Sequence, residues 1–245
     1  MKRASRRNSS PLIWFLSGLV LWAADREIAP LQGAEQPAAT APPAVRFRPQ
    51  TSGATSVRVT GGSRGTGTNA VVLDVLAPDE VGITTQEEPS LFWFQSKPAN
   101  ARFELTLLQD NKVKPIVQVQ MDRSATAGVQ RLKLSEHGAK LSPGVEYQWV
   151  VALVTDPDNR SKDQVASGVI KRIEPTADLK KKISSATAAS LPAVYADAGI
   201  WYDALSTLSD QIDAHPADQA LRKTRADLLR QVGLNAAADA ELAKE

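Results

Sequence analysis

Few residues in this chain have the types and spacing that catalysis or metal binding requires. The two histidines, His137 in SEHGAK and His215 in DAHPAD, have no nucleophile motif or metal-ligand motif around them. We therefore expect each to be a surface or helix-capping residue rather than a general base. The chain has no cysteine, so disulfides are excluded.

Acidic residues gather in two places, and neither place has the pattern of a known site. The loop DPDNRSKD contains Asp156, Asp158 and Asp163, but it lacks the Gly and the late bidentate Glu of a calcium loop. Glu87 and Glu88 are adjacent, so on a strand their side chains point to opposite faces and cannot alone form a glycosidase pair. We predict no catalytic, cofactor-binding or metal-binding residues.

The charge distribution argues against nucleic-acid binding and favours export. The formal net charge is +2, yet the first 24 residues contain four cations and no acid, so the rest of the chain is net negative. The basic start is followed by LIWFLSGLVLWAA, an apolar run of 13 residues, which is short for a membrane span and typical of a secretory signal. We expect residues 1–24 to be a signal peptide or an uncleaved N-terminal anchor. The protein would then be periplasmic or at the cell surface, and would touch the membrane only through an uncleaved leader.

Residues 25–70 are rich in Ala, Pro, Gln, Thr and Gly and have no periodic apolar pattern. Such a composition buries too little surface to offset chain entropy, so a disordered linker is predicted. The stretch GGSRGTG within it lacks the Lys-Ser/Thr ending and the following helix of a phosphate-binding loop. It is therefore interpreted as a flexible loop.

Short apolar runs separated by turns follow from residue 71, and several of them alternate between apolar and polar residues. Seven strands at this spacing predict an all-β sandwich of the immunoglobulin or fibronectin-III type over residues 71–174. The predicted strands are 71–76, 90–95, 102–108, 116–121, 129–135, 147–154 and 168–174.

The motif LSPGVEYQW sharpens this prediction. Its spacing is typical of a tyrosine corner, in which a Tyr hydroxyl hydrogen-bonds back to the backbone at the turn into a late strand. Pro143 and Gly144 would form the turn, Tyr147 would donate the hydrogen bond, and Leu141 and Trp149 would belong to the core.

After Pro175 the composition becomes helical, with Thr176 as a candidate N-cap. Gly199 is followed five residues later by Ala204, and a shift of 34 residues brings Gly233 and Ala238 into register with them. This period is that of tetratricopeptide repeats, but only about one and a half units fit, and a solenoid needs about three. We expect residues 175–245 to form a small all-α, tetratricopeptide-like region packed on the sandwich.

Four aromatic residues form the candidate interaction surface: Phe92, Phe94, Trp201 and Tyr202. One face of the strand at 90–95 carries the two phenylalanines. The alternative is structural, because a short helical tail needs support and an apolar sheet face needs a cover. In that case the tail packs its own aromatic residues on Phe92 and Phe94.

Four segments together resemble the uncharacterised bacterial family known as domain of unknown function 928: APDEVGITTQEEPSLFWF, LSPGVEYQWVVALVTDPDNRS, SGVIKRIE and YADAGIWYDALSTL. The resemblance extends from about Gly61 to the C-terminus. It implies no activity, but it does imply export and an envelope partner, since members tend to occur near extracytoplasmic sensors or outer-surface secretion systems. We therefore expect a non-enzymatic exported module that binds an unidentified envelope protein. The alternatives are a secreted hydrolase or carbohydrate-binding accessory domain, and a structural part of an outer-surface assembly.

Overall fold

The computed structural model describes residues 44–50, 57–60, 71–109, 112–121 and 126–243. The chain divides into two units, residues 1–39 and 40–245, and every described residue belongs to the second unit. The predicted leader over residues 1–24 lies outside the described residues.

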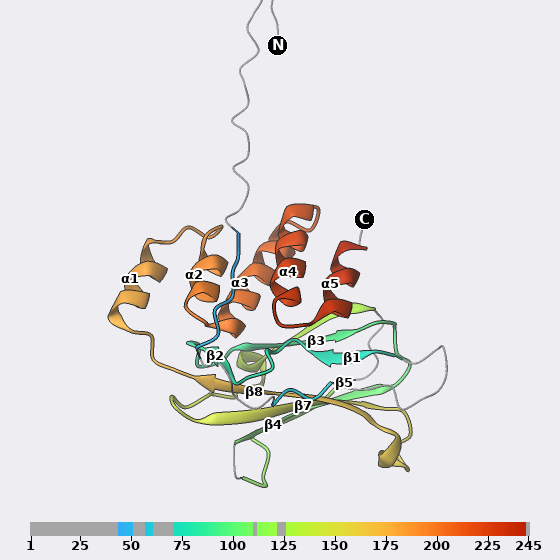
Figure 1. The fold of residues 1–245 in the computed structure, drawn as a ribbon. Helices are drawn as coiled ribbons and strands as arrows, with labels where there is room; N and C mark the ends of the chain where they lie inside the picture. The colour runs from blue at the N-terminus through green and yellow to red at the C-terminus, as the bar shows by residue number, and fades with distance from the viewer. Residues whose placement is uncertain (1–43, 51–56, 61–70, 110–111, 122–125, 244–245) are drawn as a thin grey trace, which may run out of the picture. The chain divides into compact units, whose positions relative to one another are not determined.

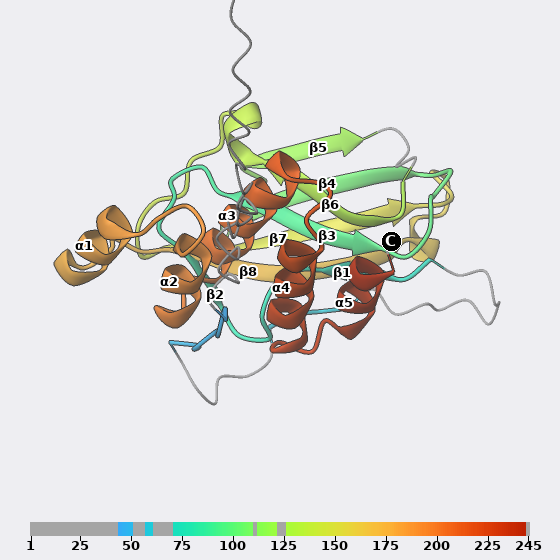
Figure 2. The same cartoon turned by 90° about the horizontal axis from the view of Figure 1, so that it is seen from above.

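The described strands form two sheets (Figures 1 and 2). The smaller sheet has the order β1-β3-β6 and is antiparallel throughout. Its strands are β1 (Leu73–Val75), β3 (Ser90–Gln95) and β6 (Gly128–Lys133). The larger sheet has the order β2-β8-β7-β4-β5, in which β2 and β8 pair in parallel and the other pairs are antiparallel. Its strands are β2 (Gly82–Thr84), β4 (Arg102–Gln109), β5 (Val117–Met121), β7 (Glu146–Val154) and β8 (Gln164–Arg172).

The described residues after the strands form five α-helices, and this helical layer lies on the outer face of the smaller sheet (Figure 1). They are α1 (Ala177–Ser185), α2 (Leu191–Asp197), α3 (Trp201–Ala214), α4 (Gln219–Arg230) and α5 (Asn235–Leu242). Two short 3-10 helices, Leu134–His137 and Arg160–Lys162, lie between the strands. Helix α3 packs on β2 and β3, and α5 packs on β6. Helix α1 contacts α2 and extends past the edge of the sheets (Figure 2).

The smaller sheet therefore lies in the middle of three layers, and the burial of its central strand follows from that position. All six residues of β3 are buried, as expected for a strand covered on both faces. Trp93 faces the larger sheet, where its ring lies 6.4 Å from that of Phe103. Phe92 faces the opposite way, toward the helices, and lines a cavity with residues of α3 and α4.

The predicted fold class was wrong. Immunoglobulin-type sheets are antiparallel, whereas the parallel pairing of β2 with β8 makes the larger sheet mixed. The helices do not form a separate all-α repeat region either, because their buried residues belong to the same hydrophobic core as those of both sheets. The described unit is a mixed α and β structure, with strands first and helices last along the chain.

The two glycines related by the 34-residue spacing lie in turns of the same conformation. Gly199 ends α2 and Gly233 ends α4, and both have φ of 75°. In each turn the next backbone N–H donates to the carbonyl five residues earlier, from Ile200 to Tyr195 at 2.9 Å and from Leu234 to Leu229 at 3.1 Å. This is the Schellman arrangement, in which glycine adopts the left-handed conformation without steric cost. Ala204 and Ala238 follow on the next helices, and both are fully buried.

Part of the predicted linker is fixed on the helices. Residues 44–50, which we call the strap, run along the helical layer (Figure 1, blue). The Phe47 ring meets the Trp201 ring edge-on at a centroid distance of 5.0 Å. The Gln231 side chain accepts a hydrogen bond from Phe47 N–H at 2.8 Å and donates one to Val45 C=O at 3.0 Å. The composition suggested disorder because the strap forms no regular element of its own and depends for its hydrogen bonds on residues far along the chain, at the ends of α2 and α4.

A second piece of the predicted linker, residues 57–60, pairs with the larger sheet. Val59 and Ser167 of β8 exchange two backbone hydrogen bonds of 2.9 Å each. Arg58 forms an ion pair of 2.7 Å with Asp79. The linker prediction therefore fails for the described parts of residues 25–70, because contacts with distant elements hold them in place.

Candidate functional site

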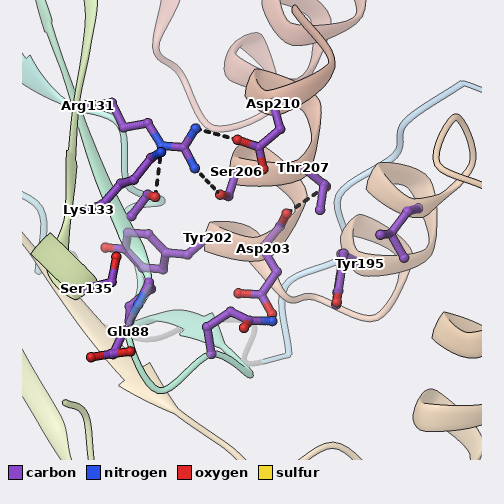
Figure 3. A pocket seen from close by; sticks show the side chains of 14 residues that line it. Glu88, Arg131, Lys133, Ser135, Tyr195, Tyr202, Asp203, Ser206, Thr207 and Asp210 are labelled. Carbon is purple, nitrogen blue, oxygen red and sulfur yellow. Dashed lines mark hydrogen bonds and ion pairs between the residues drawn. The ribbon is translucent and has the colours of Figure 1, made fainter. Parts of the chain in front are cut away.

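A pocket of about 480 Å³ opens between the smaller sheet and helices α2 and α3 (Figure 3). We call it the polar pocket, because most of its lining side chains carry hydroxyl, carboxyl, amide or cationic groups. Those residues are Gln86, Glu88, Ser90, Arg131, Lys133, Ser135, Tyr195, Tyr202, Asp203, Ser206, Thr207 and Asp210. The strand-borne groups lie on one side of the pocket and the helix-borne groups on the other.

Asp203 lies in the first turn of α3 and is 2% exposed. Its carboxylate accepts hydrogen bonds from the Thr84 hydroxyl at 2.5 Å, from Thr85 N–H at 3.0 Å and from the Thr85 hydroxyl. Burial raises the pKa of Asp203, and these hydrogen bonds oppose the rise. The carboxyl group therefore ties the end of β2 to the start of α3 and has little surface left for a ligand.

Arg131 of β6 is held across the pocket mouth by hydrogen bonds to two other elements, β3 and α3. Its guanidinium donates to the Ser90 hydroxyl of β3 at 2.9 Å, and to Asp210 at 2.5 Å and the Ser206 hydroxyl at 3.0 Å on α3 (Figure 3). It also lies over the Phe92 ring, 5.2 Å from the centroid. These bonds fix the guanidinium plane.

Two charged side chains of the polar pocket form no ion pair with another described residue. They are Glu88, which precedes β3, and Lys133, which ends β6. Tyr195 of α2 lines the opposite wall, and burial together with the nearby Asp203 charge raises its pKa. The pocket thus presents one carboxylate, one ammonium and several hydroxyl groups to a ligand.

The four aromatic residues of the candidate interaction surface are not on the surface. Phe92, Phe94, Trp201 and Tyr202 are between 0% and 2% exposed. The indole N–H of Trp201 donates to Leu76 C=O at 2.8 Å, and that of Trp149 donates to the Tyr202 hydroxyl, also at 2.8 Å. They lie between the helices and the smaller sheet, so they do not form an exposed patch on the outer surface. Sequence patterns missed the polar pocket, since its walls come from segments far apart along the chain.

The predicted corner residues lie at the start of β7. Ser142 N–H donates to the Tyr147 hydroxyl at 3.0 Å, so the hydroxyl is the acceptor and not, as expected, the donor. Gly144 has φ of 77° and its N–H donates to Arg172 C=O at 2.8 Å. Leu141, Tyr147 and Trp149 are buried, and the bend also contains Pro143, which bridges to β8.

The histidines and the acidic loop lie apart from the polar pocket. His137 belongs to an exposed 3-10 turn, and His215 ends α3 at the surface. Asp156 pairs with Lys162 at 2.9 Å, and the hydrogen bond from Lys162 lowers the pKa of Asp156. Within the ranges that the structure describes, no three His, Asp or Glu side chains are placed to hold a metal ion.

Within the residues that the structure describes, no helix has both the length and the apolar character that crossing a membrane requires.

A comparison with family models matches residues 59–242 to the family described as Domain of Unknown Function (DUF928). A comparison with curated proteins gives no match.

Proposed function

The chain belongs to the DUF928 family, and from that premise we propose that it is an exported, non-enzymatic module that binds a segment of another envelope protein in the polar pocket. The observation that carries the proposal is a difference between two groups of pocket residues: some are already hydrogen-bonded within the protein, and others are charged but form no ion pair with a described residue. The side chains of Asp203 and Arg131 form hydrogen bonds with other residues of the protein. Glu88 and Lys133 line the pocket without an ion pair to a described residue.

This arrangement suits binding better than catalysis. A general base or nucleophile must keep a lone pair directed at the substrate, and the Asp203 carboxylate is 2% exposed and already accepts three hydrogen bonds. A polypeptide, in contrast, supplies backbone donors and acceptors together with charged side chains. Glu88 and Lys133 match a segment that carries both signs of charge.

A charge-reversal experiment tests the binding proposal. Lys133→Glu and Glu88→Lys should each weaken the capture of the partner from cell envelopes that the wild-type chain retains. Lys181→Glu is the matched control, because Lys181 is exposed on α1 and does not line the pocket. Equal capture by all three variants and the wild type would contradict the proposed site.

Export is proposed from the basic segment and the short apolar run at the start of the sequence. A fusion of residues 1–40 to a reporter that is active only outside the cytoplasm should be active. A stably expressed but silent fusion would refute this part of the proposal.

A secreted hydrolase or carbohydrate-binding accessory domain is the second candidate, favoured by three carboxyl groups in one pocket. Glu88, Asp203 and Asp210 line it together, and the pKa of Asp203 is raised, as in a general acid. Release of reducing sugar from envelope polysaccharide, abolished in Asp203→Asn but retained in Lys181→Glu, would favour this candidate over the binding module.

A further inference from the structure

A second cavity, of about 310 Å³, lies on the other side of Arg131 from the polar pocket. We call it the arginine cavity, because Arg131 of β6 and Arg222 and Arg225 of α4 all line it. Phe92, Val129, Ile212 and Pro216 give the cavity an apolar wall, and Ser209 and Asp213 also line it. Three guanidinium groups beside an apolar wall form an unusual lining for a small cavity, since buried cations are costly unless they are paired.

Two of these arginines have hydrogen-bonded carboxylate partners. Arg225 is 5% exposed and binds Glu241 through Nε at 3.1 Å and through Nη2 at 2.5 Å, while its Nη1 donates to the Ser209 hydroxyl at 3.1 Å. Arg131 binds Asp210, as described above. Both groups therefore serve to join α3, α4, α5 and β6.

Arg222 differs from the other two. Its side chain is only 15% exposed, yet its nearest described carboxylate oxygen is Glu241 Oε2 at 3.9 Å, which is too long for a hydrogen bond. That same oxygen already accepts from Arg225. The one hydrogen bond that the structure gives the Arg222 guanidinium goes to Pro216 C=O, at 3.0 Å. Arg222 is thus a largely buried cation with unused N–H groups at a cavity wall.

Among the described residues that line the arginine cavity, Asp213 is the only one with a carboxylate. It lies 3.8 Å from Arg131, and its side chain is 72% exposed. Such an exposed, loosely held carboxylate contributes little to stability and can turn to solvent at low cost. An incoming carboxylate would therefore compete only with a weak partner.

We infer that the arginine cavity binds the C-terminal residue of a polypeptide, with the terminal carboxylate on Arg222 and an apolar side chain against Phe92 and Ile212. A planar carboxylate matches the fork of a guanidinium, and the apolar wall selects a carboxylate carried on an apolar residue. The inference rests on the proposed function. Since Arg131 lines both cavities, a partner segment in the polar pocket can place its last residue beside Arg222.

The test compares two small probes, N-acetyl-leucine and N-acetyl-leucinamide. They have nearly the same shape, but the first has a charged carboxylate where the second has a neutral amide. Titrated into the full chain and followed by NMR, the acid should shift the methyl signals of Val129 and Ile212. The amide should bind at least about tenfold more weakly, because it cannot form the charged hydrogen bonds. This comparison needs no variant, so it does not depend on whether a substitution folds.

Arg222→Gln should weaken the binding of the acid by a similar factor and leave that of the amide unchanged. Arg230→Gln is the matched control, since Arg230 is on the same helix but does not line the cavity. Equal binding of acid and amide, no binding of either, or unchanged binding in Arg222→Gln would overturn the inference. None of these results bears on partner capture through Lys133 and Glu88, so failure here is distinguishable from failure of the proposed function.

Discussion

The indole N–H of Trp149 donates a hydrogen bond of 2.8 Å to the hydroxyl of Tyr202, and both side chains are buried. Trp149 belongs to β7 of the larger sheet, and Tyr202 belongs to α3 in the helical layer. The Tyr202 hydroxyl in turn donates to Val169 C=O of β8 at 3.2 Å. Helix α3 therefore reaches past the smaller sheet to the larger one, which explains why the helices are not a separable domain.

Tyr202→Phe should lower the free energy of unfolding by about 1–3 kcal/mol, the usual cost of a buried polar group that loses its partner. The substitution removes one oxygen and strands the Trp149 N–H and the Val169 C=O. Urea denaturation of the full chain measures the effect. An unchanged midpoint with an unchanged slope would show that the hydrogen bond does not stabilise the fold.

Tyr147→Phe should have a smaller effect, about 0.5–1.5 kcal/mol. The hydroxyl of Tyr147 only accepts, from Ser142 N–H at 3.0 Å, and Ser142 is exposed, so water can replace the lost acceptor. The same denaturation assay, run beside Tyr202→Phe, gives the comparison. A loss in Tyr147→Phe as large as that in Tyr202→Phe would contradict the assignment.

Gly199→Ala should destabilise the chain more than Gly233→Ala does. Both positions have φ of 75°, so alanine costs about 1 kcal/mol at either. At Gly199 a Cβ would also lie 2.6 Å from Arg48 O and 2.7 Å from Gln50 Cγ of the strap, whereas at Gly233 its nearest neighbour is Arg58 Nη2 at 3.8 Å. The difference in unfolding free energy measures the displacement of the strap. Equal losses at the two turns would mean that the strap does not press on the α2–α3 turn.

Asp74→Asn should stabilise the chain at neutral pH and have little effect near pH 4. Burial raises the pKa of Asp74 from 3.8 to about 6, against the opposing effect of Arg58. Below pH 3.8 the carboxyl is neutral in both states and costs nothing. Between pH 3.8 and 6 the carboxyl ionises in the unfolded state before it does so in the folded state, so stability is lost over this window; the loss levels off above pH 6, at about 3 kcal/mol at most. Denaturation midpoints of both chains at pH 4 and pH 7.5 test this, and a gain of the same size at both pH values would exclude Asp74 as the cause.

Local patterns were sufficient for most of the secondary structure. Short apolar or alternating runs bounded by turns located β3, β4, β5, β7 and β8 to within a few residues. The N-cap at Thr176 was also predicted correctly, since its hydroxyl accepts from Leu179 N–H at 3.2 Å. Both signals are carried by residues that are neighbours in the sequence, which is why they can be recognised without a structure.

The sheet topology and the polar pocket depend on contacts between distant residues, and the patterns do not carry them. Strand β2 has three residues and was not predicted, although its parallel pairing with β8 changes the class of the fold. Asp203 is tied to Thr84 across 119 residues of sequence. Arg225 is buried and pairs with Glu241 of the next helix, and no local sequence pattern indicates this pairing.

The strap has a consequence for the order of events in folding. Arg48 N–H binds Ala196 C=O, and Phe47 N–H binds Gln231, which lies 184 residues later in the chain, so the strap cannot dock fully until the residues after α4 have been synthesised. Closing so long a loop has a large entropic cost, and contacts of high sequence separation slow the folding of a domain. The strap is thus the first described segment to be synthesised and among the last to reach its native position. Until then Trp201, which Phe47 covers, keeps an open edge on which chaperones or neighbouring chains can act.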